Sequence, residues 1–334
     1  MRYQPIAKDN PLSICFLGCG KITHRHAKSA RNCKTPISLS FASRDEKKAN
    51  IYKNKYKGQV AFGSYEAAME SEVDVVMVNT PPNTHYQLTR YALENGKHVI
   101  VEKPPFYTTT ELEELGKLAD TNALQLIIAE NYYYKPLRLA ILRELKKGVI
   151  GTPLFININA QKKQQSADWR NDPSVVKYGA LFEGGIHWIN FINNIGLELT
   201  KVHGFIPKQD GPLERSIQAA AHTKEGVVVN LFYSWETDAL LKGLRISKIF
   251  GKEGSITFET NGLFMLIRGK KTYLRFPNIT NITGQQLMFN DFMNALQTGK
   301  SPAFHWKMAK RDLKIIEAIY ESTASYKDKN KTDV

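Results

Sequence analysis

A charged pair, Glu102-Lys103, stands between the apolar run 99–101 and Pro104. If that run is a buried strand, the pair lies at its carboxyl end, which is the edge of an open α/β sheet where ligands bind. A lysine at such an edge can give a proton to a substrate oxygen or take one from it. The alternative is an ion pair that only closes the strand.

An acid and a histidine stand four residues apart in the segment 179–187, where Glu183 precedes His187. On a helix, this spacing places both side chains on one face. The histidine can then relay a proton, because its pKa lies near neutrality, while the acid orients the substrate or the imidazole. From these residues alone, a packed core histidine beside Trp188 is the stronger interpretation of His187.

A glycine turn, Gly18-Cys19-Gly20, follows the apolar run Leu12–Leu17. The first glycine permits a tight turn, and the second lets the backbone approach a pyrophosphate, which the next helix N-terminus stabilises. Thr23 takes the place of the usual third Gly or Ala, so the helix–strand packing must admit a branched side chain. Because the turn follows the first strand, it predicts a dinucleotide site rather than an ordinary strand–helix turn. The residues assigned to this site are Gly18, Gly20, Lys21 and Ile22.

The end of the second strand, Ser43-Arg44-Asp45, bears on the choice of dinucleotide. A hydroxyl followed by a guanidinium would bind a 2′-phosphate, which a carboxylate would repel. Ser43 and Arg44 therefore favour NADP(H). Asp45 leaves NAD(H) open, because a small register shift would return an acid to the ribose hydroxyls.

The elements that must position these residues alternate between strand and helix in the first third of the chain. Such alternation predicts right-handed βαβ crossovers and a parallel sheet. A capping box is predicted at Thr110 and Glu113, at the start of one helix. The predicted strands are Leu12–Leu17, Ile37–Ala42, 74–79, 98–101 and 124–129, and the predicted helices are 21–32, a segment from about Glu46, 84–95, 110–121 and 136–147.

The pattern changes after Gly151, where 155–160 alternates apolar residues with asparagine, as a strand with one wet face does. Consecutive strands follow, which predicts a large, mostly antiparallel sheet that is open on one face. We expect an α/β protein, with a Rossmann dinucleotide-binding domain over 1–128 and an α+β substrate-binding and oligomerisation domain over 129–334, whose C-terminal helix can pack back on the first domain. The predicted later strands are 201–206, 217–223, 227–235, 244–250, 255–259, 264–267 and 272–276, and the last helices are 285–296 and 307–326.

Four features together resemble the Gfo/Idh/MocA oxidoreductase family over nearly the whole chain: the glycine turn, the segment 79–85, the Glu-Lys-Pro motif and the segment 179–187. The resemblance implies hydride transfer between NAD(P) and a carbohydrate or polyol-like alcohol or ketone. It makes Lys103 the catalytic lysine, assisted by His187, and it implies a cis bond before Pro104. Glu183 departs from the family, in which Asp is commoner, so its role as orienter is in doubt. The residues that the resemblance places around the cofactor are Thr80, Pro81, Asn83, His85, Glu102 and Lys103.

Trp169-Arg170, ahead of the catalytic segment, is a further candidate for substrate binding. Arginine could hold an anionic group or hydroxyls, and tryptophan could stack on the apolar face of a sugar. A surface loop anchored by its tryptophan fits the sequence equally well. The tyrosines 132–134 face the same choice between substrate contact and packing.

The composition suits a soluble enzyme of two domains, with 334 residues, three cysteines and a formal net charge of +14. The basic residues are scattered, and the densest tract, 327–331, is a polar tail, so we expect no nucleic-acid partner. The polar stretch 1–10 lacks a signal-peptide core, and no apolar run reaches membrane-spanning length, which predicts a cytoplasmic protein without a membrane partner. The histidines and cysteines near the N-terminus have no ligand spacing, so we expect no metal.

Rival functions remain open at this stage. A glycosidase that keeps its nicotinamide bound and works by transient oxidation would use the same residues. A dinucleotide-binding regulator without turnover would not need Lys103 and His187 intact. An open sheet face also predicts a homodimer or homotetramer formed by covering it.

Overall fold

The computed structural model describes residues 3–6, 11–164, 169–173, 175–208, 211–239 and 243–329, with side chains as far as residue 323 in the last helix. The chain forms two compact units. The first comprises Met1–Glu130 and Gln285–Lys310, and the second comprises Asn131–Gly284 and Arg311–Val334. Most of the stretch 1–10 lies outside the described residues, as do the side chains of the tract 327–331.

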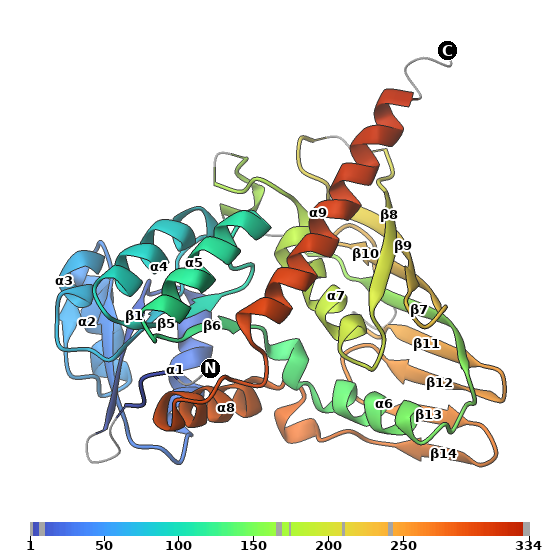
Figure 1. Cartoon of the computed structure of the whole chain (residues 1–334), viewed down its shortest axis with the longest axis horizontal. Coiled ribbons are helices and arrows are strands. Elements are labelled where there is room, and N and C mark those ends of the chain that lie inside the picture. The colour runs from blue at the N-terminus through green and yellow to red at the C-terminus, as the bar shows by residue number, and fades with distance from the viewer. Residues whose placement is uncertain are drawn as a thin grey trace. The chain divides into compact units, whose positions relative to one another are not determined.

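The first unit is built on a six-stranded sheet whose neighbouring strands all run parallel, in the order β3-β2-β1-β4-β5-β6. This is the Rossmann-type order that the strand–helix alternation predicts. Figure 1 shows α4 and α5 side by side. The strands are β1 (Leu12–Leu17), β2 (Ile37–Ala42), β3 (Ala61–Phe62), β4 (Val75–Val78), β5 (His98–Glu102) and β6 (Leu126–Ala129), and the helices are α1 (Lys21–Arg31), α2 (Glu46–Lys55), α3 (Tyr65–Met69), α4 (His85–Glu94), α5 (Thr109–Thr121) and α8 (Gln285–Thr298).

The strands β4 and β6 are apolar along their whole length, β5 is apolar between His98 and Glu102, and every residue of the three strands is buried. Such strands suit a parallel sheet that is covered on both faces. The predicted strand 74–79 is confirmed without its polar ends, and the predicted strand 98–101 extends to Glu102. The elements β3 and α3 escape prediction, because each is too short to carry a periodic pattern.

The capping box of α5 lies two residues before its predicted position. Thr108 accepts a hydrogen bond from the Glu111 N–H at 3.1 Å, and a Glu111 carboxylate oxygen accepts one from the Thr108 N–H at 3.0 Å. The prediction of Thr110 and Glu113 for these roles is therefore wrong. Both threonines precede a glutamate by three residues, so the motif alone does not choose between them. In the structure Glu113 pairs with Lys117 instead, one turn further along the helix.

The second unit holds an eight-stranded sheet in the order β14-β13-β12-β11-β7-β10-β9-β8. All neighbours are antiparallel except β7 and β10, which run parallel, so the prediction of a mostly antiparallel sheet is confirmed. Its strands are β7 (Pro153–Gln161), β8 (Leu199–Phe205), β9 (Ser216–Thr223), β10 (Val228–Ser234), β11 (Ile246–Gly251), β12 (Gly254–Glu259), β13 (Met265–Arg268) and β14 (Thr272–Arg275). Its helices include α6 (Pro136–Lys146) and α7 (Ile186–Asn193), and α9 (Trp306–Lys329) runs into this unit from the first.

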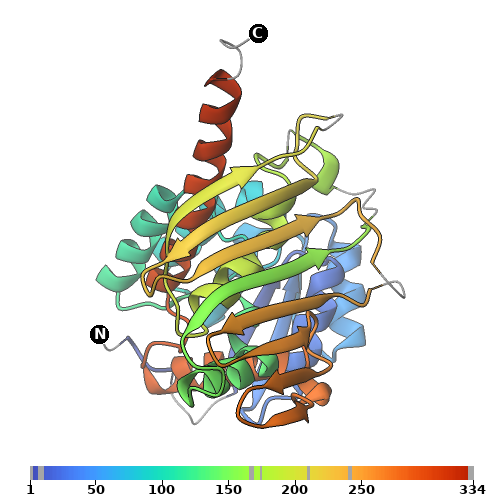
Figure 2. The same cartoon turned by 90° about the vertical axis from the view of Figure 1, so that its right-hand side faces the viewer.

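Figure 2 shows one face of this sheet turned toward the viewer, and no helix from the described part of the second unit covers it. Strand β7 explains the two faces: Ile156, Ile158 and Ala160 are buried, while the residues between them point the other way. Phe155, at 50% exposure, belongs to the open face. The alternation of apolar residues with asparagine predicted this division.

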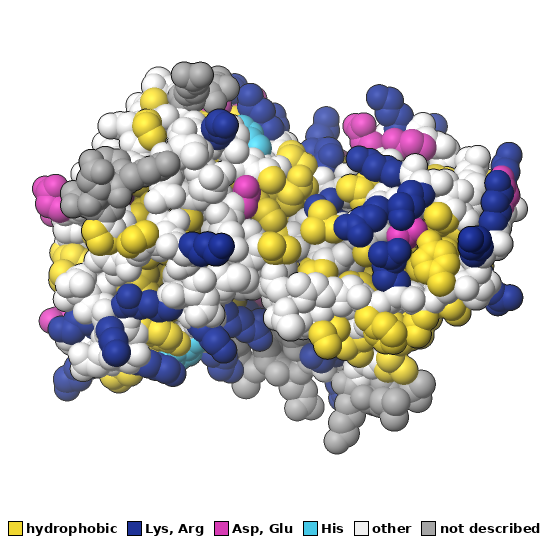
Figure 3. All heavy atoms as spheres, turned by 90° about the horizontal axis from the view of Figure 1, so that it is seen from below, with side chains coloured by type: hydrophobic (Ala, Val, Ile, Leu, Met, Phe, Trp, Pro, Cys, Tyr) yellow, Lys and Arg dark blue, Asp and Glu magenta, His cyan; other side chains and the backbone are white. Residues whose placement is uncertain are grey.

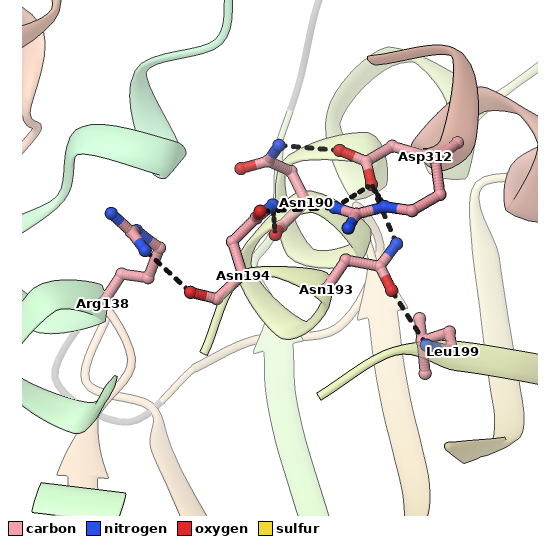
Figure 4. A network of polar contacts seen from close by, with 7 residues as sticks. Arg138, Asn190, Asn193, Asn194, Leu199 and Asp312 are labelled. Carbon is pink, nitrogen blue, oxygen red and sulfur yellow. Dashed lines mark hydrogen bonds and ion pairs between the residues drawn. The ribbon is translucent and has the colours of Figure 1, made fainter. Parts of the chain in front are cut away.

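A buried carboxylate joins α9 to α7 within the second unit (Figure 4). Asp312 accepts hydrogen bonds from the side-chain amides of Asn190 at 2.7 Å and Asn193 at 2.8 Å. Asn193 in turn accepts one from the Leu199 N–H at 3.0 Å, so the same network holds the start of β8. Burial raises the pKa of Asp312 to about 6.

The described ranges contain no helix with the length and hydropathy needed to span a membrane. Within the same ranges, no three His, Cys, Asp or Glu side chains are grouped so that they could hold a metal ion. On the face drawn in Figure 3, lysine and arginine side chains are interspersed with apolar and acidic ones.

Candidate active site

The glycine turn of the first unit combines a tight contact with an open space. Gly18 has φ +98°, and a Cβ on it would lie 3.1 Å from the Thr80 side chain. A Cβ on Gly20 would meet no atom within 4 Å, and α1 begins directly after it without a side-chain cap. Free backbone N–H groups at a helix N-terminus, behind an unobstructed glycine, are what a pyrophosphate requires. The residues present therefore fit a dinucleotide.

Thr23 shows how the turn admits a branched third residue. Its side chain is fully buried, and its hydroxyl donates a hydrogen bond to the Gly18 carbonyl at 2.7 Å. Asn79, at the end of β4, donates to the same hydroxyl at 3.3 Å, while its own buried side-chain oxygen has no hydrogen-bond partner among the described residues. A buried acceptor without a partner is costly unless a ligand supplies a donor.

The end of β2 presents its three polar residues in different ways. Ser43 is buried, whereas Arg44 is exposed and hydrogen bonds to the Tyr65 hydroxyl. Asp45 is the N-cap of α2, and its carboxylate accepts a hydrogen bond from the Lys47 N–H at 3.0 Å. Asp45 is the acid that kept NAD(H) open as an alternative in the sequence analysis, and in the structure its carboxylate caps α2.

Lys103 follows β5 directly, and the Lys103–Pro104 bond is cis. The fully buried His85 braces this edge: its Nδ1 lies 3.0 Å from the carbonyl oxygens of Pro104 and Pro105, and its Nε2 lies 2.8 Å from that of Thr80. Burial lowers the pKa of His85. The ring therefore contacts both the loop after β4 and the loop after β5, and its single N–H donates to one of them. Its predicted contact with the cofactor stays a prediction, as do those of Pro81 and Asn83.

In the second unit, the segment that carries Glu183 forms a π-helix, Leu181–Gly185, which leads into α7. Two glycines of this segment are explained by close contacts. A Cβ on Gly184 would lie 2.1 Å from the Tyr233 hydroxyl, and one on Gly179 would lie 2.0 Å from the Glu214 carbonyl oxygen. The helical spacing was predicted, but the wider π turn was not. Such turns are frequent at functional sites.

Arg170 lies against Glu183, with 2.9 Å between Nε and the carboxylate, and its guanidinium lies 4.4 Å from the Trp169 ring centroid. The structure thus brings the three predicted substrate contacts Trp169, Arg170 and Glu183 together. A charge-assisted bond of this kind fixes the orientation of the carboxylate.

The ring of His187 stacks on that of Tyr132, with centroids 4.3 Å apart and planes inclined by 12°. The ammonium of Lys135, which is only 4% exposed, lies 4.3 Å from the centroid of the same tyrosine. His187 is partly exposed, whereas its neighbours Ile186 and Trp188 are buried. Tyr132 therefore acts as a platform for the imidazole, a role that the tyrosine run alone did not reveal.

A carboxylate that the sequence analysis did not single out holds the start of the π-helix. Glu214 accepts hydrogen bonds from the N–H groups of Gly179 at 2.8 Å and Leu181 at 2.9 Å, and from the Tyr320 hydroxyl at 2.6 Å. Burial raises the pKa of this carboxyl group. Only the glycine at the head of the segment gave a signal, because a close backbone approach requires it.

The predicted site residues thus fall into two groups. Those of the glycine turn, the end of β2 and the Lys103 edge belong to the first unit, and Trp169, Arg170, Glu183 and His187 belong to the second. The first group defines a nucleotide-binding Rossmann unit with a lysine at its ligand edge, which is the architecture of a dinucleotide-dependent oxidoreductase.

Comparison with known families identifies the family to which this chain belongs. Residues 12–130 match the oxidoreductase family model with the NAD-binding Rossmann fold, and residues 139–257 match the Gfo/Idh/MocA C-terminal domain model. The protein therefore belongs to the Gfo/Idh/MocA oxidoreductase family, as its motifs suggested.

Similar curated proteins are distant. The uncharacterized oxidoreductase YfiI of Bacillus subtilis is 24% identical over 69% of this chain and 61% of its own length. D-xylose 1-dehydrogenase (NADP(+)) of Hypocrea jecorina is 33% identical over 41% of this chain and 38% of its own. The matched regions thus span less than two thirds of either relative.

Solved structures share the fold over nearly the whole chain. Levoglucosan dehydrogenase in complex with NADH and levoglucosan superposes with a TM-score of 0.84 at 18% identity, covering 95% of this chain and 98% of that one. Aldose-aldose oxidoreductase from Caulobacter crescentus gives the same TM-score at 19% identity and the same coverage.

Proposed function

We propose that this protein transfers a hydride between NADP(H) and a carbohydrate or polyol-like alcohol or ketone. The observation that carries the proposal is the open glycine turn in the same unit as the Lys103 edge: Gly20 leaves its space free, and α1 offers uncapped N–H groups. Relatives named for D-xylose and scyllo-inositol dehydrogenation with NADP(+) support the substrate class.

The chain's residues divide the work. The nicotinamide, when bound, supplies or accepts the hydride. Lys103 moves the proton of the reacting hydroxyl, and His187 relays that proton. Glu183, held by Arg170, orients substrate hydroxyls, and Trp169 offers an apolar face to a sugar ring.

The preference for NADP(H) rests on the end of β2. Asp45 is engaged as a helix cap, and the buried Ser43 hydroxyl accepts a hydrogen bond from the Asp45 N–H at 3.2 Å, so the exposed guanidinium of Arg44 is the main group for a 2′-phosphate. We expect Arg44→Ala to lower kcat/KM with NADP+ by about 10- to 100-fold and to leave the value with NAD+ nearly unchanged. Arg90→Ala, on the exposed side of α4, is the matched control. An equal loss with both cofactors would contradict the assignment.

An initial-rate assay tests the function. The protein is mixed with NADP+ and a panel of aldoses, polyols, sugar acids and glycosides, and the absorbance of NADPH and the released sugar are followed together. Net NADPH formation that Lys103→Met abolishes supports the proposal. Sugar release without net NADPH would instead establish the glycosidase, and tight cofactor binding without any turnover would establish a regulator.

We further propose that a second copy of the chain covers the open face of the eight-stranded sheet, giving a homodimer or homotetramer in the cytosol. Exposed apolar side chains on its strands support this, among them Phe155, Phe205 and Ile246. The thiols of Cys15, Cys19 and Cys33 are free, as a reducing compartment would keep them. A molar mass of a single chain in light scattering would contradict the assembly.

A further inference from the structure

A buried histidine of α1 contacts the end of β5, directly before the predicted catalytic lysine. His26 is 1% exposed, and its Nε2 lies 2.5 Å from a carboxylate oxygen of Glu102. Its Nδ1 lies 2.7 Å from the side-chain amide nitrogen of Gln285, the first residue of α8. In the sequence, His26 gave no signal beyond the absence of metal-ligand spacing.

Glu102 connects His26 to the main chain of Lys103. Its second carboxylate oxygen accepts a hydrogen bond from the Lys103 N–H at 2.9 Å. The two oxygens of one planar group are thus used by His26 and by the lysine backbone, which fixes the orientation of the carboxylate. On the other side of the lysine, His85 contacts the carbonyl oxygens of Pro104 and Pro105. The main chain at Lys103 is therefore held from both directions.

The partners of His26 also determine which of its two ring nitrogens carries the hydrogen. The amide nitrogen of Gln285 is a donor only, so the Nδ1 that faces it must accept. The ring hydrogen then lies on Nε2 and is donated to Glu102. An imidazolium would place two donors against each other at Nδ1. The contact with Gln285 therefore favours the tautomer whose hydrogen lies on Nε2, which keeps Glu102 bound as an acceptor.

We propose that His26 is a positioning residue for Lys103, acting through Glu102, and that Gln285 sets its tautomer. The inference rests on the proposed role of Lys103. It extends the site to two residues that lie outside the recognised motifs, His26 on α1 and Gln285 at the start of α8. One of them, Gln285, is where the chain re-enters the first unit.

Kinetics of three variants test the positioning. His26→Leu removes the donor, and we expect kcat to fall by about 10- to 100-fold while KM for NADP+ changes by less than about twofold. His26→Gln restores a side-chain N–H toward Glu102 and recovers most of the loss. The control is His98→Asn, a buried histidine at the opposite end of β5 whose Nδ1 accepts the Gln125 N–H. A loss in His98→Asn as large as in His26→Leu, or no rescue by glutamine, would show a packing role only.

A second measurement does not depend on activity or on the folding of a leucine variant. Long-range ¹H–¹⁵N spectra of wild-type protein labelled at histidine should show one neutral Nε2–H imidazole whose signals disappear in His26→Gln. Gln285→Glu should convert it to the imidazolium. An imidazolium or an Nδ1–H form in the wild type would overturn the tautomer and with it the inference.

The two proposals fail in different ways. Absence of turnover in the wild type refutes the proposed function, and the backbone amide signal of Lys103 then decides the positioning. If that signal moves in His26→Gln and stays in place in His98→Asn, the link through Glu102 holds. If neither variant moves it, the link is refuted.

Discussion

The lysine half of the predicted site, in the first unit, lies at strand ends, where side chains contact the backbone. The histidine half, in the second unit, combines ring stacking with one carboxylate that accepts hydrogen bonds from the start of a π-helix. Around Lys103, the side chains of His85 and Glu102 contact main-chain atoms at the strand ends. Around His187, the Tyr132 ring supplies the platform, and Glu214 holds the preceding π-helix.

The difference shows what fixes the position of the site residues in each half. Strand ends in a buried parallel sheet are fixed by register, so a short local motif suffices to place a lysine there. A helix segment over a sheet has no such frame, and its position depends on partners far along the chain. Tyr320, for example, reaches the Phe182 N–H from α9 at 3.1 Å. The histidine half should therefore tolerate change in its surroundings less well than the lysine half.

The largest expected effect separates the two chemical groups. We expect Lys103→Met to lower kcat by about 10²- to 10⁴-fold, because it removes the group that moves the hydroxyl proton. His187→Asn should lower it less, since a relay can be replaced by water. Steady-state kinetics with the best substrate of the panel measure both. A larger loss in His187→Asn than in Lys103→Met would reverse the assignment of roles.

A pair of glycine substitutions should divide stability from binding. Gly179→Ala places a Cβ 2.0 Å from the Glu214 carbonyl oxygen, and we expect the free energy of unfolding to fall by about 3 kcal/mol. Gly20→Ala meets no atom within 4 Å, so it should leave stability unchanged and raise KM for NADP+. Thermal unfolding and cofactor titration of both variants check this. Equal melting temperatures for the two variants would contradict the expected difference in stability.

The smallest expected effect concerns the anchor of α7. Burial raises the pKa of Asp312 from 3.8 to about 6, so the folded state holds this proton more tightly than the unfolded state does. The contribution of Asp312 to stability therefore grows as the pH falls through 6, by about 1 kcal/mol between about pH 7 and pH 5. The difference between the unfolding free energies of wild type and Asp312→Asn should show this change. A constant difference over that range would contradict it.

Much of the lysine half could be predicted, because its information is local. The runs before Gly18, Ser43 and Lys103 are mostly apolar, and each of these residues follows a strand directly, so pattern and position agree. Asp45 was ambiguous in sequence only because its capping bond depends on where α2 begins. The capping box of α5 failed for a similar reason, since two overlapping threonine–glutamate pairs offered the same chemistry.

The rest could not be predicted, because it depends on long-range pairing. No spacing rule connects Glu214 to Gly179, or His26 to Glu102 across 76 positions. The parallel pairing of β7 with β10 is hidden as well, since alternation reports the faces of a strand and not its direction.

The open face of the eight-stranded sheet carries a row of amide side chains across three strands. Gln218 donates to Asn230 at 3.4 Å, and Asn230 donates to Asn157 at 3.4 Å. A stripe whose polar groups already satisfy one another loses less on leaving water than isolated amides would. A second surface can therefore cover the stripe without forming a hydrogen bond to each of its polar groups. The apolar residues on either side of the stripe then determine the strength of the association.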